Sequence, residues 1–171
     1  VRPSTSSASD GGVMAGAGNT GAAQFSFSNL GSLVYVPGGP QAAGNLTMVW
    51  ADRKGTEQPL PAPPHAYNFP KLSPDGRQVA LDIAENGRDV WLYDLMRGTL
   101  TRLTFDGLNQ GAVWTPDGKR IAYRSQKAGG AANLFWKLAD GSGAEERLTT
   151  SEFQHSPQSF SPDGRILFYQ E

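Results

Sequence analysis

An all-β fold built from repeated four-stranded sheets is predicted by three observations. First, the tetrapeptide Ser73-Pro74-Asp75-Gly76 returns as Thr115-Pro116-Asp117-Gly118 and as Ser161-Pro162-Asp163-Gly164. Second, a degenerate copy at Ser28-Asn29-Leu30-Gly31 extends the series, and the four starts lie 45, 42 and 46 residues apart. Third, no segment has a convincing helical period, whereas short runs of branched and aromatic residues flank every turn. A repeat of about 40 to 50 residues with this pattern predicts a β-propeller in which each repeat forms one blade.

The tetrapeptide has the residues of a hairpin turn. Proline presets φ for the second turn position, aspartate suits the third, and glycine takes the left-handed conformation that restores strand pairing. Asp75, Asp117 and Asp163 recur once per repeat. We therefore interpret them as turn residues and not as calcium ligands or acid–base groups.

Residues 1–23 differ in composition from the repeats that follow. They are rich in Gly, Ala and Ser, contain no aromatic residue, and carry only Arg2 and Asp10 as charges. Because such a segment buries little apolar surface, we expect a flexible lead-in. The alternative is a permuted outer strand through Val13-Met14-Ala15, although its β propensity is low.

The repeats are expected to form three blades and the inner half of a fourth. The blades are predicted at residues 24–61, 67–104 and 110–149, with the half blade at 155–170. The strands within them are expected at about 23–27, 32–36, 46–51, 57–60, 67–72, 77–83, 89–94, 100–104, 110–114, 119–125, 132–138, 145–149, 155–160 and 165–170.

Two further motifs recur in the outer strands. Each predicted third strand carries a tryptophan and ends in an Asp-then-Gly turn, as at Trp91, Asp94 and Gly98. The fourth strands share Arg-Leu-Thr at 102–104 and 147–149, and the leucine is expected to face the neighbouring blade. We interpret the tryptophans as packing between blades and not as ligand-stacking residues.

Composition excludes several classes of function. Fifteen basic and sixteen acidic residues give a net charge of −1, so nothing steers the chain toward nucleic acid or an anionic membrane surface. The absence of cysteine excludes disulfides, thiolate catalysis and cysteine zinc sites. No apolar run approaches the roughly 18 residues of a membrane span, so no membrane insertion is expected. The start, Val1-Arg2-Pro3-Ser4, lacks the apolar core of a signal peptide, and its valine indicates a processed product or a piece of a longer protein.

The repeat as a whole resembles a known family. An aromatic residue, Ser/Thr-Pro-Asp-Gly, a basic residue, an apolar strand, an aromatic strand that ends near an aspartate and Arg-Leu-Thr follow one another, as in 114–149. This order resembles the WD40-like (PD40) repeats of the TolB family of propellers, over residues 24–170. It is closest to the free-standing or kinase-linked propellers of bacteria, and similar repeats occur in the propellers of prolyl-oligopeptidase-type peptidases. The resemblance implies six blades in a complete propeller and favours a periplasmic or extracytoplasmic location.

The candidate ligand face lies in the loops that lead into the inner strands. His65 and His155 are expected at equivalent positions of two blades, at the rim where propellers usually bind. The other candidates are polar or aromatic residues of the same loops: Tyr67, Asn68, Asp106, Asn109, Gln110 and Gln154. The alternative for the two histidines is an exposed loop position without a function. No spacing of these residues supports a metal site, and no cofactor is expected.

Two functions remain open from the sequence. The first is a non-catalytic interaction module that presents its polar face to a protein or peptide. The second is a substrate-gating propeller of a prolyl-oligopeptidase-like hydrolase whose catalytic domain lies outside this chain, which has no Gly-x-Ser-x-Gly elbow. Catalysis by this chain alone is not expected. Since an open arc leaves unpaired edges, the chain is either a fragment or one half of a homodimer that completes a six-bladed propeller.

Overall fold

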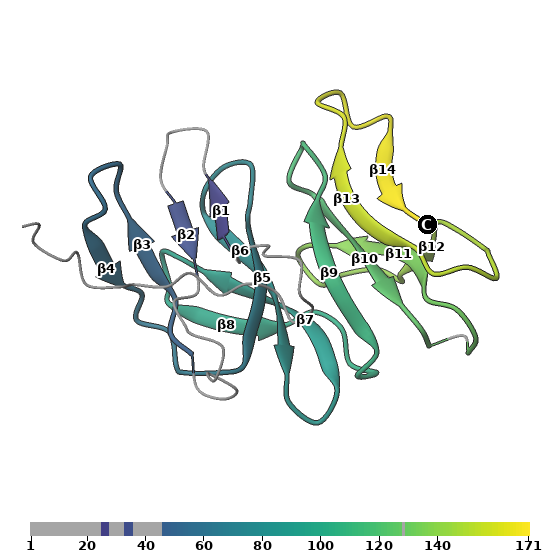
Figure 1. The fold of residues 1–171 in the computed structure, drawn as a ribbon, viewed down its shortest axis with the longest axis horizontal. Helices are drawn as coiled ribbons and strands as arrows, with labels where there is room; N and C mark the ends of the chain where they lie inside the picture. Colours follow the sequence, from purple (N-terminus) through teal and green to yellow (C-terminus); the bar gives the residue numbers. More distant parts are fainter. Residues whose placement is uncertain (1–24, 28–32, 36–45, 128) are drawn as a thin grey trace, which may run out of the picture.

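The computed structural model describes residues 25–27, 33–35, 46–127 and 129–171. Three four-stranded antiparallel sheets and one two-stranded sheet follow one another in an arc (Figure 1). The predicted all-β class, with three blades and half of a fourth, is confirmed. The expectations for residues 1–23 and for the degenerate turn at 28–31 lie outside the described residues.

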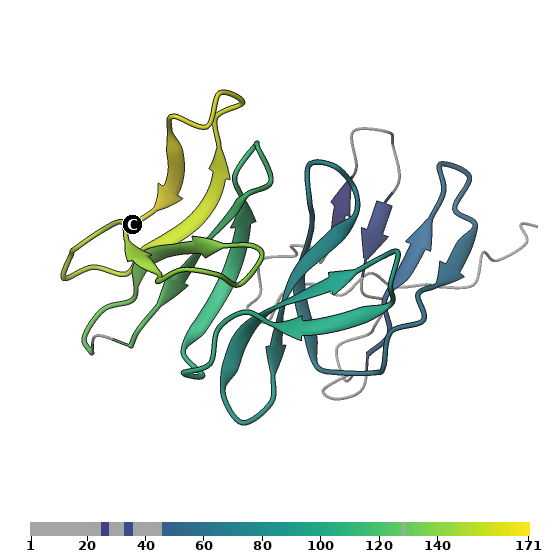
Figure 2. The same cartoon turned by 180° about the vertical axis from the view of Figure 1, so that it is seen from behind.

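Each blade runs from an inner strand to an outer one in chain order. The first contains β1 (Phe25–Phe27), β2 (Leu33–Tyr35), β3 (Val49–Ala51) and β4 (Glu57–Pro59). The second contains β5 (Tyr67–Leu72), β6 (Gln78–Ala84), β7 (Arg88–Asp94) and β8 (Thr99–Arg102). The third contains β9 (Asn109–Trp114), β10 (Arg120–Ser125), β11 (Asn133–Leu138) and β12 (Glu146–Arg147), and the half blade has β13 (Ser156–Phe160) and β14 (Leu167–Gln170). The inner strands β1, β5, β9 and β13 lie side by side, as the view from behind also shows (Figure 2).

The three Ser/Thr-Pro-Asp-Gly segments adopt one turn. In the first, the Ser73 amide donates to the Gln78 carbonyl at 2.8 Å and the Gly76 amide to the Ser73 carbonyl at 2.9 Å. The Ser73 hydroxyl donates to Asp75 Oδ1 at 2.6 Å and accepts from the Gln78 amide at 2.9 Å. This hydroxyl lowers the pKa of Asp75, because its bond favours the charged carboxylate. The three aspartates therefore accept hydrogen bonds from the Ser or Thr hydroxyl of their own turns.

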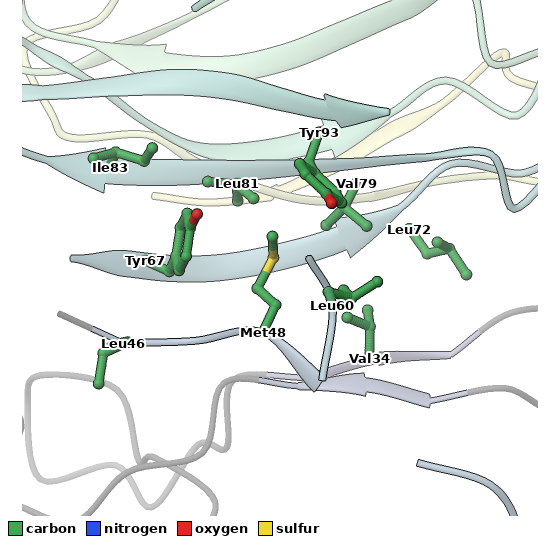
Figure 3. Packing of buried hydrophobic residues seen from close by; sticks show 10 residues of the cluster. All are labelled: Val34, Leu46, Met48, Leu60, Tyr67, Leu72, Val79, Leu81, Ile83 and Tyr93. Atoms are coloured by element: carbon green, nitrogen blue, oxygen red, sulfur yellow. The ribbon is translucent and has the colours of Figure 1, made fainter. Parts of the chain in front are cut away.

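The hydrophobic core lies between blades. Val34, Leu46, Met48 and Leu60 of the first blade face Tyr67, Val79, Leu81 and Ile83 of the second (Figure 3). A second cluster joins Val90, Leu92 and Leu103 to Trp114, Ile121 and Tyr123 of the third blade. Leu103 is only 3% exposed, so the leucine of Arg-Leu-Thr does face the neighbouring blade. Apolar burial between successive blades is the main force that fixes the arc.

Arg-Leu-Thr also attaches the outer strand by hydrogen bonds, as the second blade shows. Thr104 Oγ1 accepts from the Val90 amide at 3.0 Å and donates to Asp89 Oδ1 at 2.7 Å. The Leu103 and Thr104 amides both donate to the Val90 carbonyl, at 2.9 and 3.3 Å, which ends the regular ladder. For this reason β8 stops at Arg102, two residues before the predicted end of the strand.

Candidate functional site

A polar pocket of about 270 Å³ lies across the inner strands of three successive blades. Strands β5, β9 and β13 supply most of its walls, and β10 and β14 supply one residue each. The lining residues are Phe69, Lys71, Gln110, Gly111, Ala112, Val113, Arg124, Ser156, Pro157, Gln158 and Gln170. Since the walls come from separate repeats, the pocket exists only where the blades are assembled.

Bulges in the inner strands shape the pocket. The pairing register shifts between Asn68 and Lys71 in β5, and again within β9 and β13. Phe69 has φ of 51° and Gly111 has φ of 71° at equivalent bulge positions. A left-handed conformation is strained for a bulky residue such as phenylalanine, and such strain tends to persist at functional positions. The bulges interrupt the ladder on the wall of the pocket.

One position of the second strand holds Asp82 in the second blade and Arg124 in the third, and each reaches the inner strand of the next blade. Asp82, Arg124 and Gln170 are equivalent, because they pair with Asn68, Gln110 and Ser156 in the same register. Asp82 accepts a hydrogen bond from the Gly111 amide at 2.9 Å. Arg124 Nη1 donates to Ser156 Oγ at 3.2 Å. An acid, a base and an amide thus occupy one structural position in three successive blades.

Asp82 is a buried carboxyl group behind this pocket. Its side chain is fully buried, and burial raises its pKa to about 7, because the charged form loses its hydration. The amides of Gly111 and Ala112 and the positive charges of Arg88 and Arg124 act in the opposite direction. The carboxyl group therefore titrates near neutral pH at the junction of the second and third blades.

The eight residues predicted from the sequence differ in exposure and fall into three groups. Three are buried: Tyr67, Asn109 and His155, at 0%, 0% and 3% exposure. His65, Asn68 and Gln110 are half-buried, and Asp106 and Gln154 are exposed. Gln110 accepts from Arg88 Nη1 at 2.5 Å and is the only one of the eight among the residues that line the pocket.

The two histidines do not occupy equivalent positions. The register aligns Tyr67, Asn109 and His155, each one residue before the pairs described above, so His65 lies two residues too early. His65 Nδ1 lies 2.5 Å from Glu85 Oε1, and its ring packs edge-on against Tyr67. Counted back from the turns, His65 lies eight residues before Ser73 and His155 six residues before Ser161, so the spacing in the sequence already separates the two histidines.

His155 belongs to an arrangement that resembles a catalytic triad. Its Nδ1 lies 2.8 Å from Thr149 Oγ1, and its Nε2 lies 2.8 Å from Glu171 Oε2. Thr149 Oγ1, however, accepts from the Leu134 amide at 2.9 Å, just as Thr104 does from Val90. At the equivalent position of the preceding blade junction, Asn109 Nδ2 donates to Asp89 Oδ1 at 2.8 Å, so Asn109 and His155 both link the start of an inner strand to the blade before it.

The sequence contains a signal for three site residues that were not predicted from it. Asp82, Arg124 and Gln170 each lie seven residues after a turn aspartate, and Asp82 is the only charge in its apolar strand. Phe69, Ser156 and Pro157 had no such signal, because their role depends on the bulges. Within the described residues, no three His, Asp or Glu side chains are grouped as metal ligands. That part of the chain also has no helix long and apolar enough to cross a membrane.

Comparison with solved structures identifies the fold. TolB from Acinetobacter baumannii superposes with a TM-score of 0.68 at 23% identity, over 84% of this chain and 36% of that one. The chain has a TolB-like propeller fold. The β-propeller domain of the trilobed protease from Pyrococcus furiosus, described as having an open velcro topology, gives a TM-score of 0.60 at 15% identity, over 80% of this chain and 44% of that one.

The curated proteins that resemble this chain include a TolB protein and proteins named as peptidases. The Tol-Pal system protein TolB of Anaeromyxobacter dehalogenans is 32% identical over 104 residues, which are 60% of this chain and 24% of that protein. The uncharacterized peptidase YuxL of Bacillus subtilis is 27% identical over 106 residues, 57% of this chain and 16% of that protein. A protein provisionally named a Tricorn-like protease C-terminal subunit, from Sulfurisphaera tokodaii, is 31% identical over 58% of this chain and 11% of its own length. This chain thus spans a quarter or less of these curated relatives. No protein-family model matches it.

Proposed function

We propose that the chain is a non-catalytic binding module and that the pocket across β5, β9 and β13 holds an extended segment of a protein or peptide. The pocket itself is the observation that carries this proposal. It lies where the inner strands of several blades meet, and concave surfaces of this kind are the usual binding sites of scaffold folds.

The chemistry of the walls suits a peptide. Gln110, Ser156 and Gln170 offer hydrogen-bond donors and acceptors, while Phe69 and Pro157 offer apolar surface. A peptide needs both kinds of wall, because its backbone carries one donor and one acceptor per residue between its side chains. A volume of about 270 Å³ is at the small end for binding pockets and fits a few residues of a chain.

A panning experiment tests the proposal. Random nonapeptides displayed on phage are selected for binding to the immobilised chain. The affinities of the selected peptides are then measured by calorimetry. We expect the double variant Gln158→Ala/Gln170→Ala to weaken binding at least tenfold, because both exposed side chains line the pocket. Gln58→Ala, an equally exposed glutamine on β4, is the matched control and should leave binding unchanged. Mass spectrometry of the incubated peptides should find them intact.

Two results would contradict this function. One is the absence of any peptide bound above background. The other is an equal loss of affinity in the pocket variant and in the Gln58 control, which would place the peptides elsewhere on the surface.

The gating role is the second candidate, and the peptidase names of two relatives favour it. A gate passes peptides and does not retain them. In that case the selected peptides would bind no tighter than about 1 mM, whereas a binding module should hold them near 1 μM, a difference of roughly 4 kcal/mol. The calorimetry above therefore separates the two roles.

A further inference from the structure

Arg124 is a half-buried cation on the wall of the pocket. Its guanidinium donates from Nη1 to the neutral hydroxyl of Ser156 at 3.2 Å. Its Nε is buried and has no hydrogen-bond partner among the described residues. Arginine stays charged at every physiological pH and carries five donors, so this side chain has donor capacity to spare.

Five of the nine described arginines form ion pairs with carboxylates, whereas Arg124, Arg53, Arg88 and Arg147 do not. Arg102 is paired with Asp89, Arg120 with Glu146 at 2.9 Å, and Arg97 with Asp94 at 3.9 Å. No described acidic residue forms an ion pair with Arg124. The same holds for Lys71, the second cation of the pocket wall, which comes from β5 of the preceding blade.

Asp82 interacts electrostatically with Arg124 but forms no ion pair with it. Asp82 directs its carboxyl group to the Gly111 amide and lies behind the wall, fully buried. The residues that line the pocket therefore include two cations and no acid. A partly buried cation without a counter-charge is costly, and an anionic ligand would remove this cost.

We infer that Arg124 anchors a carboxylate of the peptide ligand, with Lys71 as a second positive charge across the pocket. This inference rests on the proposed peptide-binding function and adds the class of ligand. The planar guanidinium matches a carboxylate with two parallel hydrogen bonds, and Phe69 and Pro157 exclude water beside it. The carboxylate comes either from an acidic side chain or from the end of a peptide.

Matched peptides test the anchor. Ac-Ala-Ala-Glu-NH2 is compared with its neutral analogue Ac-Ala-Ala-Gln-NH2, and Ac-Ala-Ala-Ala-OH with Ac-Ala-Ala-Ala-NH2, at about 0.15 M ionic strength to screen distant charges. Binding is followed by NMR through the Arg124 Nε–Hε signal and the Gly111 amide. We expect an acid to bind at least tenfold tighter than its amide and to shift the Nε–Hε signal. The pair that shows the preference identifies the source of the carboxylate.

Variants separate the anchor from general charge effects. Arg124→Gln should reduce the acid-to-amide ratio to about 1, and Arg124→Lys should keep part of the preference. Arg53→Gln, an exposed arginine in the β3–β4 turn, should keep all of it. The wild-type proton–nitrogen spectrum serves as the check that each variant is folded.

Three outcomes would overturn the anchor. If acids and amides shift the Gly111 amide with equal affinity, the pocket binds peptides but has no carboxylate anchor, and the proposed function stands. If no peptide shifts any pocket signal, the anchor and the proposed function both fail. If inorganic phosphate binds more tightly than every carboxylate peptide, the ligand class is wrong.

Discussion

Asp82 is the residue at which packing and charge conflict. It is fully buried on β6, yet its neighbours across the blade junction are the backbone amides of β9, Arg88 on β7 and Arg124 on β10. Its folded pKa of about 7 lies above the ordinary value of 3.8. The folded protein therefore binds more protons than the unfolded chain between these two values. The contribution of Asp82 to stability is complete below about pH 4 and is lost as the pH rises through 7.

Replacing Asp82 with asparagine should remove this dependence. At pH 8 we expect Asp82→Asn to raise the free energy of unfolding by on the order of 2 to 4 kcal/mol, because three pKa units correspond to about 4 kcal/mol. Near pH 4 the variant and the wild type should be equally stable. Urea unfolding at several pH values measures the difference.

The control for this prediction has the opposite sign. Asp52 is exposed, and hydrogen bonds from the Thr56 and Lys54 amides lower its pKa. Asp52→Asn should therefore lose stability relative to wild type as the pH rises, if it changes at all. Parallel pH profiles for wild type and Asp82→Asn would show that Asp82 titrates normally.

At the scale of the element, the third and fourth strands of the second and third blades are each joined by one threonine. Thr104 and Thr149 each accept from a backbone amide of the third strand, at 3.0 and 2.9 Å. The arginine two residues earlier donates Nε to the threonine carbonyl, at 2.9 and 2.8 Å. The recurrence of Arg-Leu-Thr in the sequence thus reflects the way an outer strand is attached.

Removal of the Thr104 hydroxyl should destabilise the second blade. Thr104→Ala leaves the Val90 amide without its side-chain acceptor and removes one of the hydrogen bonds to Asp89, at a cost of about 1 to 3 kcal/mol. Thr101→Ala, an exposed threonine on β8, is the control and should change stability by less than about 0.5 kcal/mol. Thermal unfolding measures both. Equal melting temperatures for the two variants would contradict the role of Thr104.

The strands and turns were predictable because each is marked by a short sequence motif. The turn at Ser73 to Gly76 and the leucine of Arg-Leu-Thr act within one hairpin or one blade face, and such rules can be read along the chain. The pocket was not predictable in this way. Phe69, Arg124 and Ser156 come from three blades, and they meet only because bulges and pairing register place them together. The opposite error concerns His65 and His155. Both lie in loops that lead into inner strands and were therefore predicted to be equivalent, whereas the strand register aligns His155 with Tyr67.

At the scale of the whole molecule, the last described blade is the most exposed. Ile166 and Phe168, before and within β14, are 65% and 67% exposed, whereas Ala80 and Ala122, equivalent to Phe168, are fully buried. A sheet that shows large apolar side chains tends to associate. A homodimer that completes a propeller remains our hypothesis for the partner of this surface.

Solution mass tests this hypothesis. Light scattering over a dilution series should show the chain above 18.3 kDa, with a dimer near twice that mass at the higher concentrations. Ile166→Ser/Phe168→Ser should restore the monomer. Met96→Ser, at an exposed methionine in the β7–β8 turn, should not. A wild type that stays at 18.3 kDa at every concentration would refute self-association through β14.

The position shared by Asp82, Arg124 and Gln170 also bears on how such a chain diversifies. In the second and third blades the Ser/Thr-Pro-Asp-Gly turn, the interblade leucine and the threonine attachment are the same, whereas this position changes from Asp82 to Arg124. Substitution at Arg124 or Gln170 alters the pocket wall and leaves these framework residues unchanged. Substitution of one residue per repeat is thus enough, in evolution or in protein engineering, to give the same arc of blades a new ligand preference.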